Sequence, residues 1–192
     1  MDIIAIADKY GVRLTPEQLC AFSDAWSMAW TLLPSDWAVE FEAAPASARF
    51  HQNYAGGLLE HCAAMGLWLY SRTADCCQSA QADLTVAECA RIALFHDLCK
   101  VGLYAMGDDG AYHSNKEMYK HHALLSVQRC AQLGITLSQK ERVAILLHMA
   151  GGFFNEEDIA ALMSGDRQWL FDNLLAGLRI VGAVQWADMK AC

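Results

Sequence analysis

The chain has 192 residues, which is enough for one domain with a substantial buried core. Hydrophobic residues make up 55% of it and charged residues 19%, a composition that argues against intrinsic disorder. The net charge of −8 and the lack of any basic run argue against an extended nucleic-acid interface, although a bound metal could still attract a small anionic ligand.

Apolar residues recur at spacings of three and four along nearly the whole chain, which is the pattern of helices rather than strands. In chain order, helices are expected at 2–10, 16–33, 54–72, 85–100, 117–133, 138–150, 156–164 and 167–190. Capping signals mark three of the starts: Thr15 before Pro16, Thr85 with Glu88, and Ser138 with Glu141. The Gly, Asp and Asn content of 106–115 predicts a turn or short hairpin between two helices.

No internal repeat, low-complexity tract or linker divides the sequence. We therefore expect one all-α domain over 1–192, in which 1–45 is a helical N-terminal extension. Trp26 and Trp30 share a helix face in this extension, and Trp37 follows. Core packing is the expected role of these indoles, while a dimer surface or an aromatic lid over a substrate stays open, as does a homodimer.

No signal peptide is apparent, and the apolar runs are too short to span a bilayer, so a cytoplasmic protein without a membrane partner is expected. The eight cysteines include no CxxC pair that would indicate zinc or redox chemistry. No role is assigned to the adjacent Cys76 and Cys77. Small buried hydrophobes are expected at five positions in helical apolar patterns: Cys20, Cys62, Cys89, Cys99 and Cys130.

Four strongly apolar segments carry titratable side chains, namely His61; His96, Asp97 and Lys100; His148; and Asp188. A buried imidazole can simply be hydrogen-bonded. Burying Asp97 and Asp188 is harder to explain, because an unpaired carboxylate is costly and no arginine on the same turns can pair with both. A divalent cation resolves this cost, and imidazole with carboxylate suits Mn, Fe, Co, Ni or Zn.

Lys100 follows His96 by four residues and Asp97 by three, so on a helix it lies on their side. Two roles are open from this spacing. The ammonium group could hold an anionic oxygen beside the metals, or it could be a cation at a helix C-terminus that interacts with the helix dipole.

The order of these residues resembles the HD superfamily of metal-dependent phosphohydrolases. The resemblance covers 45–192 and is carried by FHQNYAGGLLEH (50–61), ALFHDLCKVG (93–102), KHHALLSV (120–127), LLHMAGGF (146–153) and WADMKAC (186–192). The succession of GGLLEH and HDLCK is its most specific part. The resemblance implies a helical bundle of the HD type over 46–192, with the metal site in its core.

By position, His61, His96, Asp97 and Asp188 resemble the four ligands of a primary metal, with Asp97 as the bridge to a second ion. His122 and His148 resemble the further histidines of two-metal members. His122 is preferred to His121 because small Ser126, one turn on, leaves room for a metal or substrate. Neighbouring ligands fall on separate helices, as a site in a bundle core requires.

The resemblance also implies that His51, Asn53 and Tyr54 face the site and contact substrate, while a surface or packing role stays open for each of them. Ala55 departs from it, since many relatives have a basic residue there, so a phosphate contact is missing. Glu60 could orient the imidazole of His61 or face solvent. The loop 106–120, which includes Tyr112, His113, Lys116 and Lys120, could select substrate or merely connect two helices.

The implied activity is cleavage of a nucleotide or another small phosphate ester by a metal-activated water, with Asp97 and Lys100 as catalytic residues. The cofactor would be one or two divalent transition-metal ions (Mn, Fe, Co, Ni or Zn), with Mg also allowed. Two alternatives stay open. One is a di-iron oxygenase built with the same ligands, and the other is a nucleotide-binding module without turnover.

Overall fold

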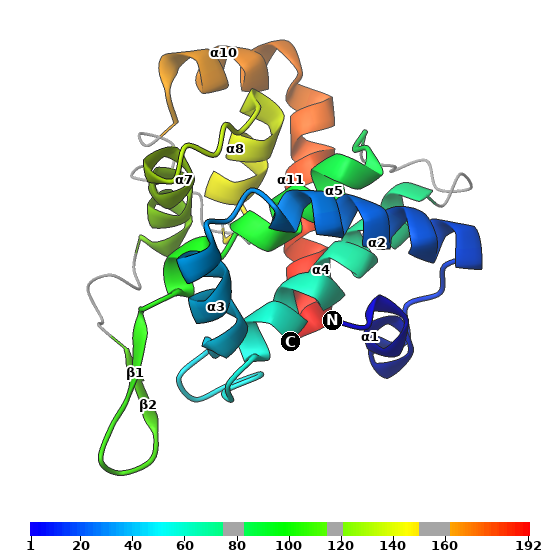
Figure 1. Ribbon diagram of the computed structural model, residues 1–192. Helices are drawn as coiled ribbons and strands as arrows, with labels where there is room; N and C mark the ends of the chain where they lie inside the picture. Colours follow the sequence, from blue (N-terminus) through cyan, green and yellow to red (C-terminus); the bar gives the residue numbers. More distant parts are fainter. Residues whose placement is uncertain (75–82, 115–120, 150–161) are drawn as a thin grey trace.

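The computed structural model describes residues 1–74, 83–114, 121–149 and 162–192 (Figure 1). Its helices are α1 (Ile3–Tyr10), α2 (Pro16–Trp30), α3 (Ser35–Ala43), α4 (Gly57–Ala74), α5 (Val86–Phe95), α7 (His122–Gln132), α8 (Gln139–Leu146), α10 (Ser164–Asp172) and α11 (Leu174–Ala191). A 3₁₀ turn, η1 (Leu98–Lys100), follows α5, and a small antiparallel sheet pairs β1 (Tyr104–Met106) with β2 (Tyr112–Ser114). The described residues are thus mostly helical, as expected.

Helix α4 is the centre of the packing. It lies against α5 and α11, while α2 crosses α5 (Figure 1). Leu58, Met65, Leu67 and Leu69 of α4 are all fully buried. Most of the surface of α4 is therefore covered, and His61 on this helix is held away from water.

Local sequence accounts for three helix starts. Thr15, Thr85 and Ser138 each accept a hydrogen bond from the backbone three residues on, and a Glu or Gln side chain at that position bonds back. Charged pairs then tie helices together. Arg91 of α5 binds Glu141 of α8 at 2.5 Å, and Arg142 of α8 binds the buried Asp166 of α10 at 2.6 Å.

Several boundaries differ from the sequence-based expectation. The helix expected over 16–33 ends at Trp30, and α3 follows Pro34, which acts as its N-cap residue. The helix expected over 85–100 ends at Phe95, and the one expected over 167–190 is interrupted at Asn173. Most of the expected helix at 156–164 lies outside the described residues, as do 117–120 and residue 150.

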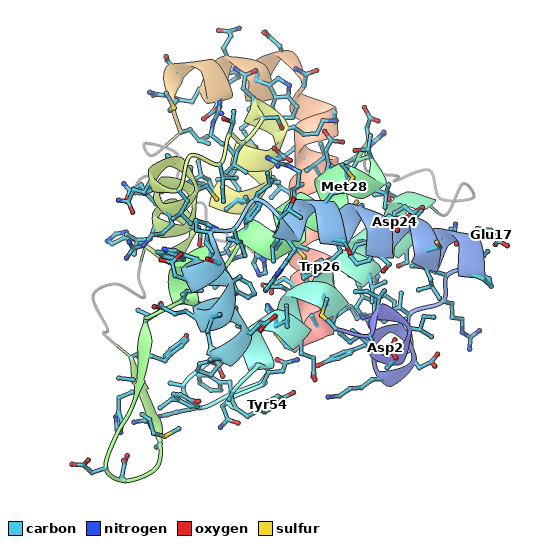
Figure 2. All side chains as sticks on the ribbon, in the orientation of Figure 1. Asp2, Glu17, Asp24, Trp26, Met28 and Tyr54 are labelled. Carbon is cyan, nitrogen blue, oxygen red and sulfur yellow. The ribbon has the colours of Figure 1, made fainter. Side chains whose placement is uncertain are left out.

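The hairpin at 106–115 is confirmed, with Ala105 opposite His113 in the register. The N-terminal tryptophans pack as expected. Trp26 is 5% exposed, and Trp30 meets Phe41 edge to face at 5.6 Å (Figure 2). The guanidinium of Arg129 lies 5.4 Å from the ring centroid of Trp37, so this extension packs against the rest of the chain.

Four of the five cysteines expected in the core are buried, whereas Cys20 is exposed because it lies on the outer side of α2. No disulfide joins the cysteines that the structure describes; Cys76 and Cys77 are outside that part. No helix among the described residues combines the length and apolar character needed to cross a bilayer.

Candidate metal centre

The loop before α4 owes its path to two glycines of the GGLLEH motif. Gly56 has φ +86°, which favours glycine, and a Cβ at Gly57 would overlap the carbonyl oxygen of Gln52. Gln52 itself has φ +41°, and its amide nitrogen donates to the carbonyl oxygen of Ala191 and to the hydroxyl of Tyr10, both at 2.6 Å. The loop is therefore held closely against α4 and the end of α11.

We expect Gly57→Ala to lower the free energy of unfolding by on the order of 3 kcal/mol, because the methyl group must displace the backbone of Gln52. Urea denaturation measures this. Gly182→Ala is the matched control, since its Cβ would meet nothing within 4 Å on exposed helix surface, and it should be neutral or slightly stabilising. Equal stability of Gly57→Ala and the wild-type protein would refute the close approach.

His61 lies near the start of α4, is fully buried and faces α11. Its Nε2 atom is 3.0 Å from Oδ1 of Asp188 and 3.6 Å from Oδ2 of Asp97. Neither ring nitrogen of His61 makes a hydrogen bond of acceptable geometry. The imidazole is thus placed between two carboxylates that arrive from other parts of the chain.

The end of α5 places the His-Asp doublet. His96 is the C-cap residue of α5, and its Nδ1 donates to the carbonyl oxygen of Ala93 at 2.8 Å. Since a carbonyl only accepts, Nδ1 carries a proton, and the other ring nitrogen, Nε2, lies 3.1 Å from Oδ2 of Asp97; it offers a lone pair to a cation only in the neutral form of the ring. Asp97 leaves the helix with φ −114° and ψ 20°, which brings its carboxylate into the space beside His61.

Two further histidines lie on the other side of Asp97 from His61. His148 follows α8, and its Nδ1 donates to the carbonyl oxygen of Ile145 at 2.7 Å, so its Nε2 is also presented. His122 begins α7, is buried, and has Nε2 at 3.9 Å from Oδ1 of Asp97. The ring centroid of His148 lies 5.0 Å from that of His96 and 5.1 Å from that of His122. His121, the other candidate, is exposed.

Ser126 makes a contact that the sequence did not indicate. Its hydroxyl accepts a hydrogen bond from the backbone of Cys99 at 3.2 Å. This hydrogen bond joins α7 to the η1 turn, which positions His122 beside Asp97.

Five of these six side chains, all but His122, lie in groups that could hold a cation. Ligand atoms of His61, His96 and Asp188 lie within 4.8 Å of one another, and so do those of His96, Asp97 and His148. Nε2 of His96 and Oδ1 of Asp97 are buried without a hydrogen-bond partner. Unpaired buried polar atoms cost free energy, and a metal would satisfy them. Imidazole and carboxylate together suit Mn, Fe, Co, Ni or Zn.

The electrostatics keep both kinds of ligand in a usable form. Burial raises the pKa of Asp97, but Lys100 and His96 outweigh burial and hold that pKa well below its usual value. Burial and the neighbouring His96 lower the pKa of His148 to about 3, so its ring is neutral at physiological pH. His96 differs: burial lowers its pKa, yet Asp97 and Asp188 raise it above the usual value, so a cation has to displace that proton.

Lys100 is buried, and its Nζ donates to Oδ2 of Asp97 at 2.7 Å. It ends the three-residue η1 turn rather than a long helix, and its ammonium is paired with the Asp97 carboxylate. A buried ammonium beside the carboxylate of the centre is available to an anionic ligand there.

Of the three residues expected to contact substrate, only His51 lies against the ligand cluster, with its ring centroid 5.0 Å from that of His61. Asn53 and Tyr54 are exposed and line a separate cavity against the hairpin. Figure 2 shows Tyr54 on the loop before α4. The contact of Asn53 and Tyr54 with substrate stays a prediction. The hydroxyl of Tyr54 donates to Glu60 at 2.7 Å, as does that of Tyr10 at 2.6 Å.

Glu60 does not orient His61, because the ring nitrogens of that histidine have no hydrogen-bond partner. Its carboxylate instead binds Lys9 of α1 at 2.7 Å, which ties the first helix to α4. Cys192 was given no role from the sequence, although it follows Asp188 by four residues and so shares its helix face. Its Sγ lies 3.6 Å from Nε2 of His51.

Comparison with known proteins does not extend this description: no family model, no curated protein and no solved structure matches the chain. The site is therefore argued from its own geometry.

Proposed function

We propose that the chain is a metal-dependent phosphohydrolase of the HD type that cleaves a nucleotide or another small phosphate ester. The observation that carries this proposal is the buried cluster of histidines and carboxylates with unsatisfied ligand atoms, next to a buried lysine. The order of the motifs along the chain resembles the HD superfamily, and the helical bundle is compatible with that resemblance.

In this proposal, His61, His96, Asp97 and Asp188 hold one cation, and His122 and His148 complete a second position that Asp97 shares. The two oxygens of Asp97 suit this role, because Oδ2 faces His96 and Oδ1 faces His122. When bound, such ions lower the pKa of a coordinated water and neutralise phosphate charge.

The protein contributes the rest of the chemistry through fixed charges. The ammonium of Lys100, held at 2.7 Å from Asp97, is positioned to stabilise charge on a non-bridging phosphate oxygen. Its burial strengthens that interaction, since a low dielectric weakens screening. The neutral ring of His148 stays available as a ligand rather than as an acid.

A cavity of about 340 Å³ lies between the loop before α4 and the hairpin, and its lining favours a nucleotide as substrate, although none of the proposed ligands lines it. Phe50, which precedes His51, and Tyr104, which follows Lys100 by four residues, both line it together with Tyr112. Aromatic rings stack on nucleobases regardless of their identity. Arg49 and His113 on the same walls offer donors to polar groups.

The experiment is metal analysis of purified protein coupled to a panel of nucleotides and phosphate esters, assayed with Mn²⁺ or Co²⁺ without oxygen. We expect phosphate release in the wild-type protein. Lys100→Met should lower kcat on the order of a hundredfold, because one charge-stabilising donor is lost. Lys140→Met, which removes a lysine paired with Glu88 on the surface, is the matched control and should keep full activity.

Three results would contradict the proposal. Unchanged turnover in Lys100→Met would remove that lysine from the mechanism. Oxygen consumption with an iron-loaded protein and no phosphate release would indicate a di-iron oxygenase. Tight nucleotide binding without any product would indicate a binding module.

A further inference from the structure

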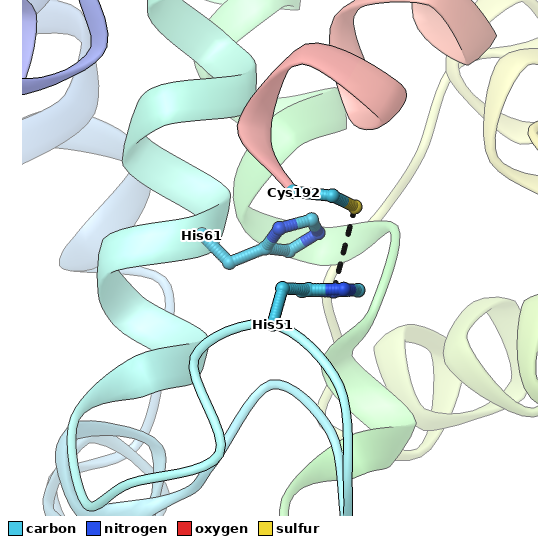
Figure 3. Close-up of side chains that lie close together, drawn as sticks. All are labelled: His51, His61 and Cys192. Carbon is cyan, nitrogen blue, oxygen red and sulfur yellow. Dashed lines mark hydrogen bonds between the residues drawn. The ribbon is translucent and has the colours of Figure 1, made fainter.

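Cys192, His51 and His61 meet at the outer side of the centre (Figure 3). The Sγ atom of Cys192 lies 3.6 Å from Nε2 of His51, and the rings of His51 and His61 lie 5.0 Å apart at 32°. One ligand atom from each of the three residues lies within 4.8 Å of the other two. A thiol and two imidazoles therefore converge from three parts of the chain.

The three groups are held by contacts of their own. The amide of Gln52 donates to the carbonyl oxygen of Ala191 at 2.6 Å, which joins the residue after His51 to the residue before Cys192. The hydroxyl of Ser47 donates to the carbonyl oxygen of His51 at 2.7 Å. His61 lies in the N-terminal part of α4 and is fully buried. The arrangement is thus largely preorganised, which reduces the entropic cost of binding a ligand.

The spacing fits tetrahedral coordination by a thiophilic cation. Zn–S and Zn–N bonds of roughly 2.3 and 2.0–2.1 Å place the sulfur and a nitrogen of one tetrahedron about 3.6 Å apart. The observed separation of Cys192 Sγ and His51 Nε2 is 3.6 Å. His61 supplies a second, fully buried imidazole whose ring nitrogens have no hydrogen-bond partner.

We propose that Cys192, His51 and His61 form a further cation site, selective for thiophilic ions such as Zn²⁺, Co²⁺ or Cd²⁺. Because a neutral imidazole offers one lone pair, this site competes with the proposed catalytic centre for His61. A thiolate ligand distinguishes this site from the centre, whose other ligands are imidazoles and carboxylates. On binding, the thiol proton is released to solvent and the sulfur lone pair forms the bond to the cation.

A cobalt titration of the full chain tests the site. Co²⁺ bound to a thiolate gives an intense near-ultraviolet charge-transfer band, which imidazole and carboxylate ligands do not give. We expect this band in the wild-type protein and its loss in Cys192→Ser. Cys20→Ser is the matched control, because Cys20 is also an exposed cysteine but lies on α2, and it should keep the band.

A second variant, His51→Gln, should weaken the cobalt affinity reported by this band by at least tenfold while leaving Cys192 in place. No thiolate band at saturating cobalt, or an equal band in Cys192→Ser, would overturn the proposal. The readout is independent of catalysis, so the site can be present in a protein that cleaves no phosphate ester, and absent from one that does.

Discussion

Asp97→Ala should lose at least one equivalent of bound metal and lower kcat for the phosphate ester on the order of a thousandfold or more. The reason is the central position of this carboxylate. Its Oδ2 lies 3.1 Å from Nε2 of His96 and 3.6 Å from that of His61, while Oδ1 faces His122 at 3.9 Å. No other carboxylate among the described residues reaches both sides of the cluster. Metal analysis of the purified variant and a phosphate-release assay measure the two effects.

Removal of Asp97 also leaves the ammonium of Lys100 buried without its partner, which can destabilise the protein. Asp97→Asn keeps the side-chain volume and so separates the loss of metal from the loss of stability. This variant should fold but lose metal and activity. Asp166→Asn is the matched control, because Asp166 is a fully buried carboxylate paired with Arg142 away from the centre. It should lower stability and keep full metal content. Full metal content in Asp97→Ala would refute the site.

Helix starts were predictable because the determining interactions are local. The bonds of Thr85 with Glu88 and of Ser138 with Glu141 span three residues and are encoded by residue type alone. The hairpin at 106–115 was predictable for the same reason. Its turn residues are adjacent in sequence, and Gly110 supplies a positive φ of +72°.

The end of α5 was not predictable from periodicity. Apolar residues continue at helical spacing through Leu98 and Val101, so the pattern favours a helix up to Lys100. Tertiary contact overrides this preference, because Ser126 of α7 accepts a hydrogen bond from the backbone of Cys99 and stabilises the 3₁₀ turn. The same turn brings Asp97 and Lys100 together at 2.7 Å.

The cluster itself was predictable in part. His61, His96 and Asp188 stand out because they are titratable groups in apolar sequence, and the structure brings them together. The positions of His51 and Cys192 depend on the path of the loop before α4, which long-range bonds of Gln52 determine. Asn53 and Tyr54 are adjacent to His51 in sequence, yet the same loop turns them toward the hairpin cavity.

Metal should stabilise the folded chain, and this distinguishes a cation site from a set of buried ion pairs. The pairs of Asp97 with Lys100 and His96 could by themselves neutralise the carboxylate. They leave Oδ1 of Asp97 and both nitrogens of His61 without a hydrogen-bond partner. A cation that binds only the folded state, and whose free concentration is a hundred times its Kd, adds about 2.7 kcal/mol to the free energy of unfolding.

For a chain of this length, that increment corresponds to a rise in Tm of about 5–11 °C. Thermal unfolding followed by circular dichroism, with Mn²⁺ or Co²⁺ added and then removed by a chelator, measures it. The rise should be absent in Asp97→Asn and present in Asp166→Asn. An identical Tm with and without metal, in a wild-type protein shown to be free of metal at the start, would mean that the ion pairs alone neutralise the cluster. The buried histidines would then be structural rather than ligands, and the hydrolase mechanism would lose its basis.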